Sequence, residues 1–349
     1  MSGKRHHFVP RFLQKSFSHR RSGNEYYCWV FKKSIPSYEA NIKNIGLERF
    51  FYSIDTETEL DDKITKKEEL ELFPIIDRLR ADLITESDTP RIAEMLTHFE
   101  TRAKHFRSNA TASFAGILSE FDRVFSNESS LYPFLKEVLS LRSPFFQKAL
   151  NDAGLNLNLV SALFESQPEL LDRATRDIAK NISGKILKER ESTRENLIRS
   201  AKSGHLQSLA NEISSSARTD RYKELNFSII NHPNESLILG DSILLFEIDG
   251  TRKFTPFLDK KDKLISVILP LSSKKYLAGH YGNSFKEPEN LNLEIASCSL
   301  DYFISGLNDA STQSLQDEIG KNAHWVTEKQ VSEIFHDCMV SAINFDKDI

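Results

Sequence analysis

Two adjacent histidines near the N-terminus are the residues whose types and spacing most directly suggest chemistry. His6 and His7 lie in the stretch KRHHFVPRFL, between a basic pair and Pro10. Pro10 suits the start of a helix over residues 8–17, and the free N–H groups of that helix would favour an anion beside the histidines. A neutral imidazole there could accept a proton, which predicts a catalytic base next to a phosphate. The alternative, that the histidines only cap and dock the helix, stays open.

Basic side chains surround the histidine pair. Lys4, Arg5 and Arg11 are the candidates for binding a phosphate or a nucleic acid. Residues 1–37 contain eight Lys or Arg and one acid, whereas the whole chain has a net charge of -4. A basic segment on a mildly acidic protein can meet a phosphate or an acidic partner, and it can equally pack on the protein's own acidic helices.

A second candidate group is His98, Arg102 and His105, at positions i, i+4 and i+7 of a predicted helix. This spacing places all three on one helix face. Two histidines could shuttle protons while Arg102 stabilises the charge of a phosphodiester transition state. We therefore count Arg102 as a catalytic candidate, and His98 and His105 as candidates for phosphate binding. A solvated polar face is the alternative.

A third candidate is Asp241 in LILGDSILLF, an acid between apolar runs. It could be a catalytic carboxylate, a metal ligand beside His7, or a turn residue. The metal would be a divalent cation such as Mg²⁺ or Mn²⁺. His280 could converge with Asp241, although the spacing does not require it. The pattern Arg199 to His205 resembles a helical RNase motif only formally, and Gly204 predicts that the helix ends there.

The composition bounds the class of protein. The 349 residues are 39% hydrophobic and 28% charged, which is typical of a soluble globular chain. No apolar stretch approaches a membrane span, and no secretory signal is evident, so we expect no membrane partner. Three widely spaced cysteines without a Cys-x-x-Cys pair favour a reducing cytoplasm. Phosphate-binding loops, dinucleotide fingerprints, nucleophile elbows and His-Glu-x-x-His are absent from the sequence.

The hydrophobic periodicity changes along the chain. Residues 1–58 predict a basic helix and short strands, residues 59–222 are mainly helical, and residues 223–349 predict strands with terminal helices. The runs 26–31, 237–248, 264–271 and 276–281 predict strands, with a Gly-Asp turn inside the second, and HWVT at 324–327 predicts an edge strand. The fold class is therefore α+β, with a helical middle and a smaller, mostly antiparallel sheet formed by the N-terminal and C-terminal segments. The three regions could form one compact domain.

These segments together resemble the bacterial domain-of-unknown-function family 4238. That family has a Lys/Arg-His-His/Tyr-x-Val-Pro start, a helix ending in Phe, a Trp-containing strand and a Phe-Tyr element. They match KRHHFVPRFLQKSF, YCWVF and LERFFY here, and LILGDSILLFEI followed by VILPLSS resembles the downstream block. Two motifs differ from the family pattern. Residues Gly240 to Ile243 occupy the place of a Ser-Asp-small-Pro run, and Arg102 or Arg142 is the candidate for the arginine of an Arg-Thr-Pro-like motif. The resemblance implies a fold and supplies no activity.

Two functions follow as hypotheses. The first is a cytoplasmic, nuclease-like effector of bacterial defence or stress response, which hydrolyses phosphodiesters with the N-terminal histidines. The second is a non-enzymatic binding or sensor module, in which the His-His-x-Val-Pro segment is structural or docks a partner. Nucleic acid is the partner expected under the first hypothesis, and a protein partner is open under the second.

Overall fold

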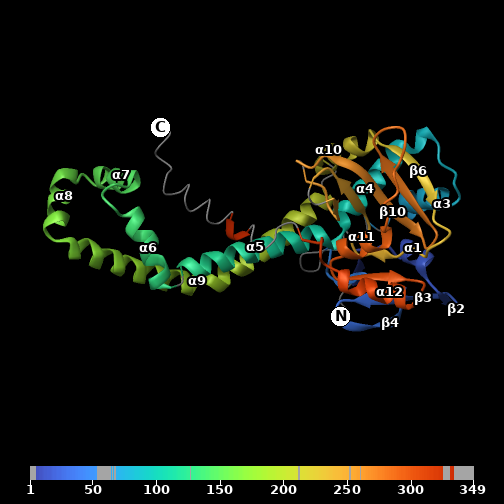
Figure 1. Ribbon diagram of the computed structural model, residues 1–349, viewed down its shortest axis with the longest axis horizontal. Helices are drawn as coiled ribbons and strands as arrows, with labels where there is room; N and C mark the ends of the chain where they lie inside the picture. Colours follow the sequence, from blue (N-terminus) through green and yellow to red (C-terminus); the bar gives the residue numbers. More distant parts are fainter. Residues whose placement is uncertain are drawn as a thin grey trace. The chain divides into compact units, whose positions relative to one another are not determined.

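The computed structural model describes residues 5–52, 64, 66, 68–125, 127–210, 213–250, 253–259, 261–324 and 331–333. Contacts divide the chain into two units (Figure 1). Unit 1 contains residues 1–108 and 202–324, and unit 2 contains residues 109–201 and 325–349. Unit 1 combines sheets with helices, while the described part of unit 2 is helical. The predicted α+β class is confirmed.

Every strand pairing in the described residues is antiparallel. The strands are β1 (Arg5–His7), β2 (Arg20–Ser22), β3 (Glu25–Lys32), β4 (Ile35–Asn41), β5 (Leu47–Arg49), β6 (Asn226–Asn231), β7 (Leu239–Gly240), β8 (Leu245–Ile248), β9 (Phe254–Thr255), β10 (Leu264–Ser272), β11 (Lys275–His280) and β12 (Tyr302–Ser305). One sheet has the order β2-β3-β12-β7, with β4 on the other edge of β3. A second sheet has the order β6-β11-β10-β8-β9, and β1 pairs with β5 alone.

The first sheet joins the two ends of the chain, as the sequence predicted. Strand β12 pairs with β3, so that Tyr302 lies opposite Lys32 and Phe303 opposite Phe31. The Phe31 and Phe303 rings are fully buried and stacked, with centroids 4.8 Å apart. Burial of such large rings contributes roughly 1.5–3 kcal/mol each, so this pair holds the N-terminal hairpin to the C-terminal strand.

The stretch LILGDSILLFEI forms two strands, but they do not form a hairpin. Strand β7 pairs with β12 in the first sheet, whereas β8 pairs with β10 in the second. The chain therefore crosses between sheets at residues 241–244. Gly240 allows the close approach of helix α11 (Leu291–Cys298), because a Cβ atom there would lie 2.4 Å from Ser299 Oγ, just past the helix end.

Helices complete the core of unit 1. They include α3 (Phe73–Arg80), α4 (Thr89–Arg102) and α10 (Ile213–Lys223), and the predicted apolar stripe of α4 is buried at Ile92, Leu96 and Phe99. Helix α4 contacts α10, and α3 contacts β10. Helix α11 contacts β7 of one sheet and β8 and β9 of the other, and it lies between the sheets in Figure 1.

Two predicted helices differ from the structure. The helix expected over residues 8–17 is a short α1 (Arg11–Gln14) followed by a 3₁₀ turn over Lys15–Phe17, and the histidines before it form β1. The helix expected to carry His98, Arg102 and His105 is broken. Helix α4 ends at Arg102, Ala103 has an extended ψ of 142°, and α5 (Lys104–Phe125) begins one residue later.

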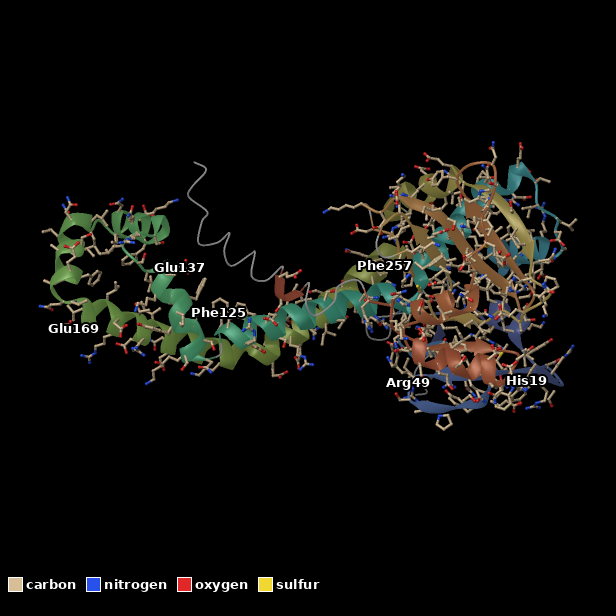
Figure 2. All side chains as sticks on the ribbon, in the orientation of Figure 1. His19, Arg49, Phe125, Glu137, Glu169 and Phe257 are labelled. Carbon is tan, nitrogen blue, oxygen red and sulfur yellow. The ribbon has the colours of Figure 1, made fainter. Side chains whose placement is uncertain are left out.

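Unit 2 has a small core of its own. Its helices are α6 (Glu128–Val138), α7 (Pro144–Asp152), α8 (Leu157–Ser166), and parts of α5 and of α9 (Pro168–Ala210). Leu131, Leu135 and Ala179 are buried together, and Phe125 packs against them (labelled in Figure 2). Helix α9 continues through Gly204, so the helix end predicted there is wrong. His324 is not in a strand, and residues 325–327 of the expected edge strand lie outside the described residues.

Within the part of the chain that the structure describes, no helix has both the length and the apolar character for a membrane span.

Candidate functional site

His6 is part of the internal structure of unit 1. In the β1–β5 ladder it lies opposite Glu48, and only 3% of its surface is exposed. Its Nδ1 atom accepts a hydrogen bond from the Tyr52 backbone N–H at 2.9 Å, and its ring stacks on the Tyr52 ring with centroids 5.5 Å apart. The imidazole thus fastens the Phe-Tyr segment to β1, and it is not open to a substrate.

His7 lies on the opposite face of β1 and is half-buried. Burial, followed by the positive charge of Arg11, lowers the pKa of His7 to about 4, while a hydrogen bond with the backbone of Ile42 acts in the other direction. The ring is therefore neutral at pH 7. Its Nε2 atom has no hydrogen-bond partner among the described residues. That Nε2 atom is itself buried, as is the Nε2 atom of His6, so neither motif histidine presents an open ring nitrogen.

Arg102 holds the N-terminal motif through its backbone. Its Nε donates to the Phe8 carbonyl at 3.1 Å, and its Nη2 donates to the His7 carbonyl. The Tyr52 hydroxyl donates to the same His7 carbonyl at 3.0 Å, and the guanidinium lies over the Tyr52 ring. Only 2% of Arg102 is exposed. These contacts position Phe8 and His7, and they leave the guanidinium away from any open surface.

Asp241 binds the backbone at the start of β12. The carboxylate is fully buried and accepts N–H groups from Leu300 at 2.7 Å, Asp301 at 2.8 Å and Tyr302 at 3.3 Å. The Asp241 N–H donates in turn to the Tyr302 carbonyl at 3.1 Å. Three N–H donors offset the cost of burying the charge. Asp241 is thus more than a turn residue, because it fixes residues 300–302 in place.

A divalent metal site at Asp241 and His7 does not fit this arrangement. Both carboxylate oxygens of Asp241 already accept backbone N–H groups. The imidazole that approaches the carboxylate is that of His105, whose Nε2 lies 3.8 Å from Asp241 Oδ1. Across the described residues, no group of three or more His, Cys, Asp or Glu side chains is placed to hold a metal ion.

The remaining candidate residues do not come together in one site. His98 and His105 are buried, with 9% and 2% exposed, so they form neither an open catalytic face nor a solvated one. Arg5 and Arg11 are exposed, and Lys4 lies outside the described residues. Helix α1 is too short to offer an anion site at its N-terminus. His280 is buried in β11 beside Phe285, in the second sheet.

Two further groups, a histidine and a cysteine, are also internal. His205 is fully buried, its Nε2 bonds the Thr101 carbonyl at 2.9 Å, and burial lowers its pKa to about 4. Burial raises the pKa of the Cys28 thiol to about 12, which makes it a poor nucleophile. Cys338 lies outside the described residues.

A cavity of about 660 Å³ opens in unit 1 beside the histidine motif. Its walls come from stretches that are distant in sequence, and Lys104 and residues 319–324 complete them. The other wall segments are Phe8 of the motif, the β3–β4 hairpin (30–38), residues 44–47 before and in β5, and residues 300–302 held by Asp241. The volume falls in the range of small-molecule sites, roughly 300–1,000 Å³.

Positive charge predominates in the cavity walls. Lys32, Lys33 and Lys104 line it, and Asp301 is the carboxylate that faces them. Lys104 pairs with Asp301 at 2.7 Å. Among the residues that the structure describes, the ammonium groups of Lys32 and Lys33 make no ion pair. The cavity thus carries an excess of positive charge on a chain whose net charge is -4.

A buried hydroxyl lies at the inner wall. Tyr302 lines the cavity, is 6% exposed, and its hydroxyl has no hydrogen-bond partner among the described residues. Burial, followed by the negative charges of Asp241 and Asp301, raises the pKa of Tyr302 well above its usual value, so the group is a neutral donor. Gly46, which also lines the cavity, lies against this hydroxyl.

Sequence reasoning missed this cavity. Lys32 and Lys33 stand out in the sequence only as part of the basic N-terminal segment, and Tyr38 and Tyr302 carry no pattern that sets them apart. The adjacent lysines directly after the strand predicted over 26–31 could have marked a turn. Nothing local in the sequence places residues 300–302 beside that turn.

The family model described as "Protein of unknown function (DUF4238)" matches residues 5–342. The chain belongs to this family. No curated protein and no solved structure matches it. In this DUF4238 chain the stretches that carried the resemblance meet in unit 1: β1 with β5 and Tyr52, and Asp241 with the start of β12.

Proposed function

We propose that this DUF4238 chain is a non-enzymatic binding module that takes a small anionic ligand in the cavity of unit 1. The observation that carries the proposal is the charge of the walls, where Lys32, Lys33 and Lys104 face Asp301 alone. An anion would find two ammonium groups that have no other ion-pair partner in the described chain. In a partly enclosed site such charges are screened less than on an open surface.

The His-His-x-Val-Pro segment acts as a structural element in this proposal. His6 and the carbonyls of His7 and Phe8 are engaged by Tyr52 and Arg102. These bonds place Phe8 in the cavity wall. Asp241 does the same for residues 300–302 from the other side. Motif residues that the sequence marked as catalytic candidates therefore hold the walls of the binding site in position.

Thermal unfolding of the full chain with a panel of anions tests the proposal. The panel contains phosphorylated, carboxylated and sulfated small molecules at millimolar concentration, with ionic strength held constant. A ligand that binds only the folded chain raises its melting temperature. We expect at least one class to do so for wild type but not for the Lys32→Glu/Lys33→Glu variant. If no anion shifts the melting temperature of wild type, the proposal is wrong.

The second candidate is the nuclease-like effector, acting on nucleic acid in the cytoplasm in bacterial defence or stress response. The observation that favours it is His7, whose neutral ring has a buried Nε2 without a hydrogen-bond partner among the described residues and is influenced by the charge of the exposed Arg11. Its weakness is the low pKa of His7, because a general base works best with a pKa near the operating pH. We rank it below the binding module for that reason.

Cleavage assays separate the two candidates. Wild type and His7→Ala are incubated with labelled RNA and DNA, with Mg²⁺, with Mn²⁺ and with a chelator. The binding module predicts no cleavage under any condition. Cleavage by wild type that is lost in His7→Ala, at unchanged melting temperature, would support the nuclease and exclude the purely binding function.

A further inference from the structure

We infer that the ligand of the cavity is a nucleotide, whose phosphate binds the lysines and whose base packs against strand β4. The inference rests on the proposed function, since it names the class of ligand for the same site. Three features of the walls support it: clustered ammonium groups, an exposed aromatic ring, and a buried hydroxyl without a partner.

The phosphate end is defined by three lysines from two elements. Lys32 ends β3, Lys33 follows it in the hairpin turn, and Lys104 begins α5. Ser34, the next turn residue, has a φ of 64°, and Lys32 pairs with Ile35 across the turn. Lys104 is already neutralised by Asp301, whereas Lys32 and Lys33 are not neutralised within the described chain. Two uncompensated charges match a phosphate monoester, which carries nearly two negative charges at pH 7.

The base end is defined by Tyr38 and Ile35 of β4. Both line the cavity, and they are 40% and 45% exposed, so a flat ligand can reach them. Directly paired residues in neighbouring strands project to the same face of a sheet. The register places Lys32 opposite both Tyr302 and Ile35 and, beyond a register shift in the β3–β4 ladder, Val30 opposite Tyr38. Charge and aromatic ring thus share one surface.

Aromatic rings favour nucleobases because every base has a π-face that stacks on them. An anion without a ring, such as inorganic phosphate, would use the lysines and leave Tyr38 and Ile35 in water. A cavity built only for phosphate also has no use for about 660 Å³. The lysines and the exposed ring together favour a ligand with both a phosphate and a base.

The Tyr302 hydroxyl is an unused polar group buried at the inner wall. It is a neutral donor and acceptor that the described protein residues leave unused. A buried hydroxyl without a partner costs free energy, so a ligand that supplies a hydrogen bond relieves this cost. Because the oxygen is enclosed, a ribose hydroxyl or a base edge would reach it only when the wall beside Gly46 moves. This group distinguishes the cavity from a merely basic surface patch.

The same chemistry occurs in a free nucleotide and in the 5′-phosphorylated end of a nucleic-acid strand. Calorimetric titration of the full chain therefore uses both kinds of probe. They are the four nucleoside 5′-monophosphates, adenosine, inorganic phosphate, and a tetranucleotide with a 5′-phosphate or a 5′-hydroxyl. A preference for the monophosphate or for the phosphorylated tetranucleotide identifies the source, and either preference supports the inference.

Matched variants test each end of the site. We expect at least one monophosphate to bind about tenfold more tightly than adenosine or phosphate, and Lys32→Ala/Lys33→Ala to weaken it roughly tenfold. Lys223→Ala/Lys263→Ala removes two exposed lysines that do not line the cavity, and it should bind as wild type does. Tyr38→Ala should weaken binding and Tyr38→Phe should retain it, since stacking needs only the ring.

Two contrary results have different meanings. If other anions bind through Lys32 and Lys33 while nucleotides do not bind, or bind Tyr38→Ala as well as wild type, the nucleotide inference is overturned and the anion-binding module stands. If no anion binds wild type, or the Lys32→Ala/Lys33→Ala variant binds as wild type does, both are overturned. Melting temperatures of all variants check that each chain is folded.

Discussion

The hydroxyl of Tyr302 occupies the space that a side chain at Gly46 would need. A Cβ atom on Gly46 would lie 2.8 Å from Tyr302 Oη and 2.8 Å from the Cβ of Val9. Gly46 also has a φ of 65°, which other residues adopt at a cost. The backbone N–H groups of Phe8 and Val9 both donate to its carbonyl, at 2.8 and 3.2 Å. One glycine thus joins the N-terminal motif to β12.

We predict that Gly46→Ala lowers the free energy of unfolding by about 2–4 kcal/mol, from the positive φ together with the steric overlap. Gly23→Ala is a matched control, because Gly23 has a φ of 57° and a Cβ atom there would have nothing within 4 Å. Gly23→Ala should therefore show only the conformational cost, about 1 kcal/mol. Urea denaturation of both variants measures the difference. Equal losses would contradict the steric role of Tyr302 and Val9.

We predict that Asp241→Asn destabilises the chain by about 3 kcal/mol. The carboxylate accepts three backbone N–H groups, and the amide would oppose one of them with its own NH₂ group. Asp301→Asn is the control, because that carboxylate is half-exposed and pairs only with Lys104 in the described chain. Its loss should cost less than about 1 kcal/mol.

The affinity for an anionic ligand is a second measurement on the Asp301→Asn variant. Asp301→Asn frees Lys104, so an anionic ligand should bind this variant more tightly than wild type. Weaker binding to Asp301→Asn would indicate that the carboxylate contacts the ligand directly. If Asp241→Asn is as stable as wild type, Asp241 does not hold residues 300–302 as the structure indicates.

Periodicity predicts the elements better than their connections. Strands β3, β10 and β11 and the helical middle region follow directly from runs of apolar residues. The Gly-Asp segment predicts a hairpin because Gly and Asp are common turn residues. The structure instead sends β7 and β8 to different sheets, since β7 is paired by β12 from the C-terminal region. Strand partners chosen over such distances leave no local signal.

The local sequence also fails to predict how the candidate site residues are arranged. His98, Arg102 and His105 have the spacing of one helix face, and Ala103 is a good helix former, so nothing local indicates the break. The break lets Arg102 reach the carbonyls of His7 and Phe8 while Lys104 reaches Asp301. Composition alone reveals the basic N-terminal segment. Which of its lysines line a cavity depends on β12 and Asp241, and the local sequence cannot show that.

We predict that Arg102→Lys lowers the free energy of unfolding by about 2 kcal/mol. A lysine cannot donate from two fixed directions to the carbonyls of Phe8 and His7, so one buried acceptor would lose its partner. Arg142→Lys is the control: that side chain is exposed in unit 2, and the change should stay within about 0.5 kcal/mol. A nuclease in which Arg102 is catalytic would instead lose cleavage at unchanged stability.

The buried His205 predicts a pH dependence of stability. Burial lowers its pKa in the folded chain to about 4, against the ordinary histidine value of 6.5. Between these values the unfolded chain binds a proton that the folded chain does not, so stability falls as the pH falls. The loss from this one histidine is roughly 2 kcal/mol between pH 6.5 and pH 4.5. His205→Gln cannot take up this proton and should lose less stability over that interval.

Urea denaturation at several pH values measures this slope. His232→Gln is the control, because His232 is only half-buried and contacts Glu235 and Glu287. Carboxylates also titrate at the acid end of the interval, but they are common to all three proteins and cancel in the comparison. His205→Gln should be less stable than wild type at pH 7, where the bond to the Thr101 carbonyl is lost, and the difference should narrow toward pH 4.5. A constant difference would mean that His205 takes up its proton over the same pH range in the folded and the unfolded chain, contrary to the effect of its burial.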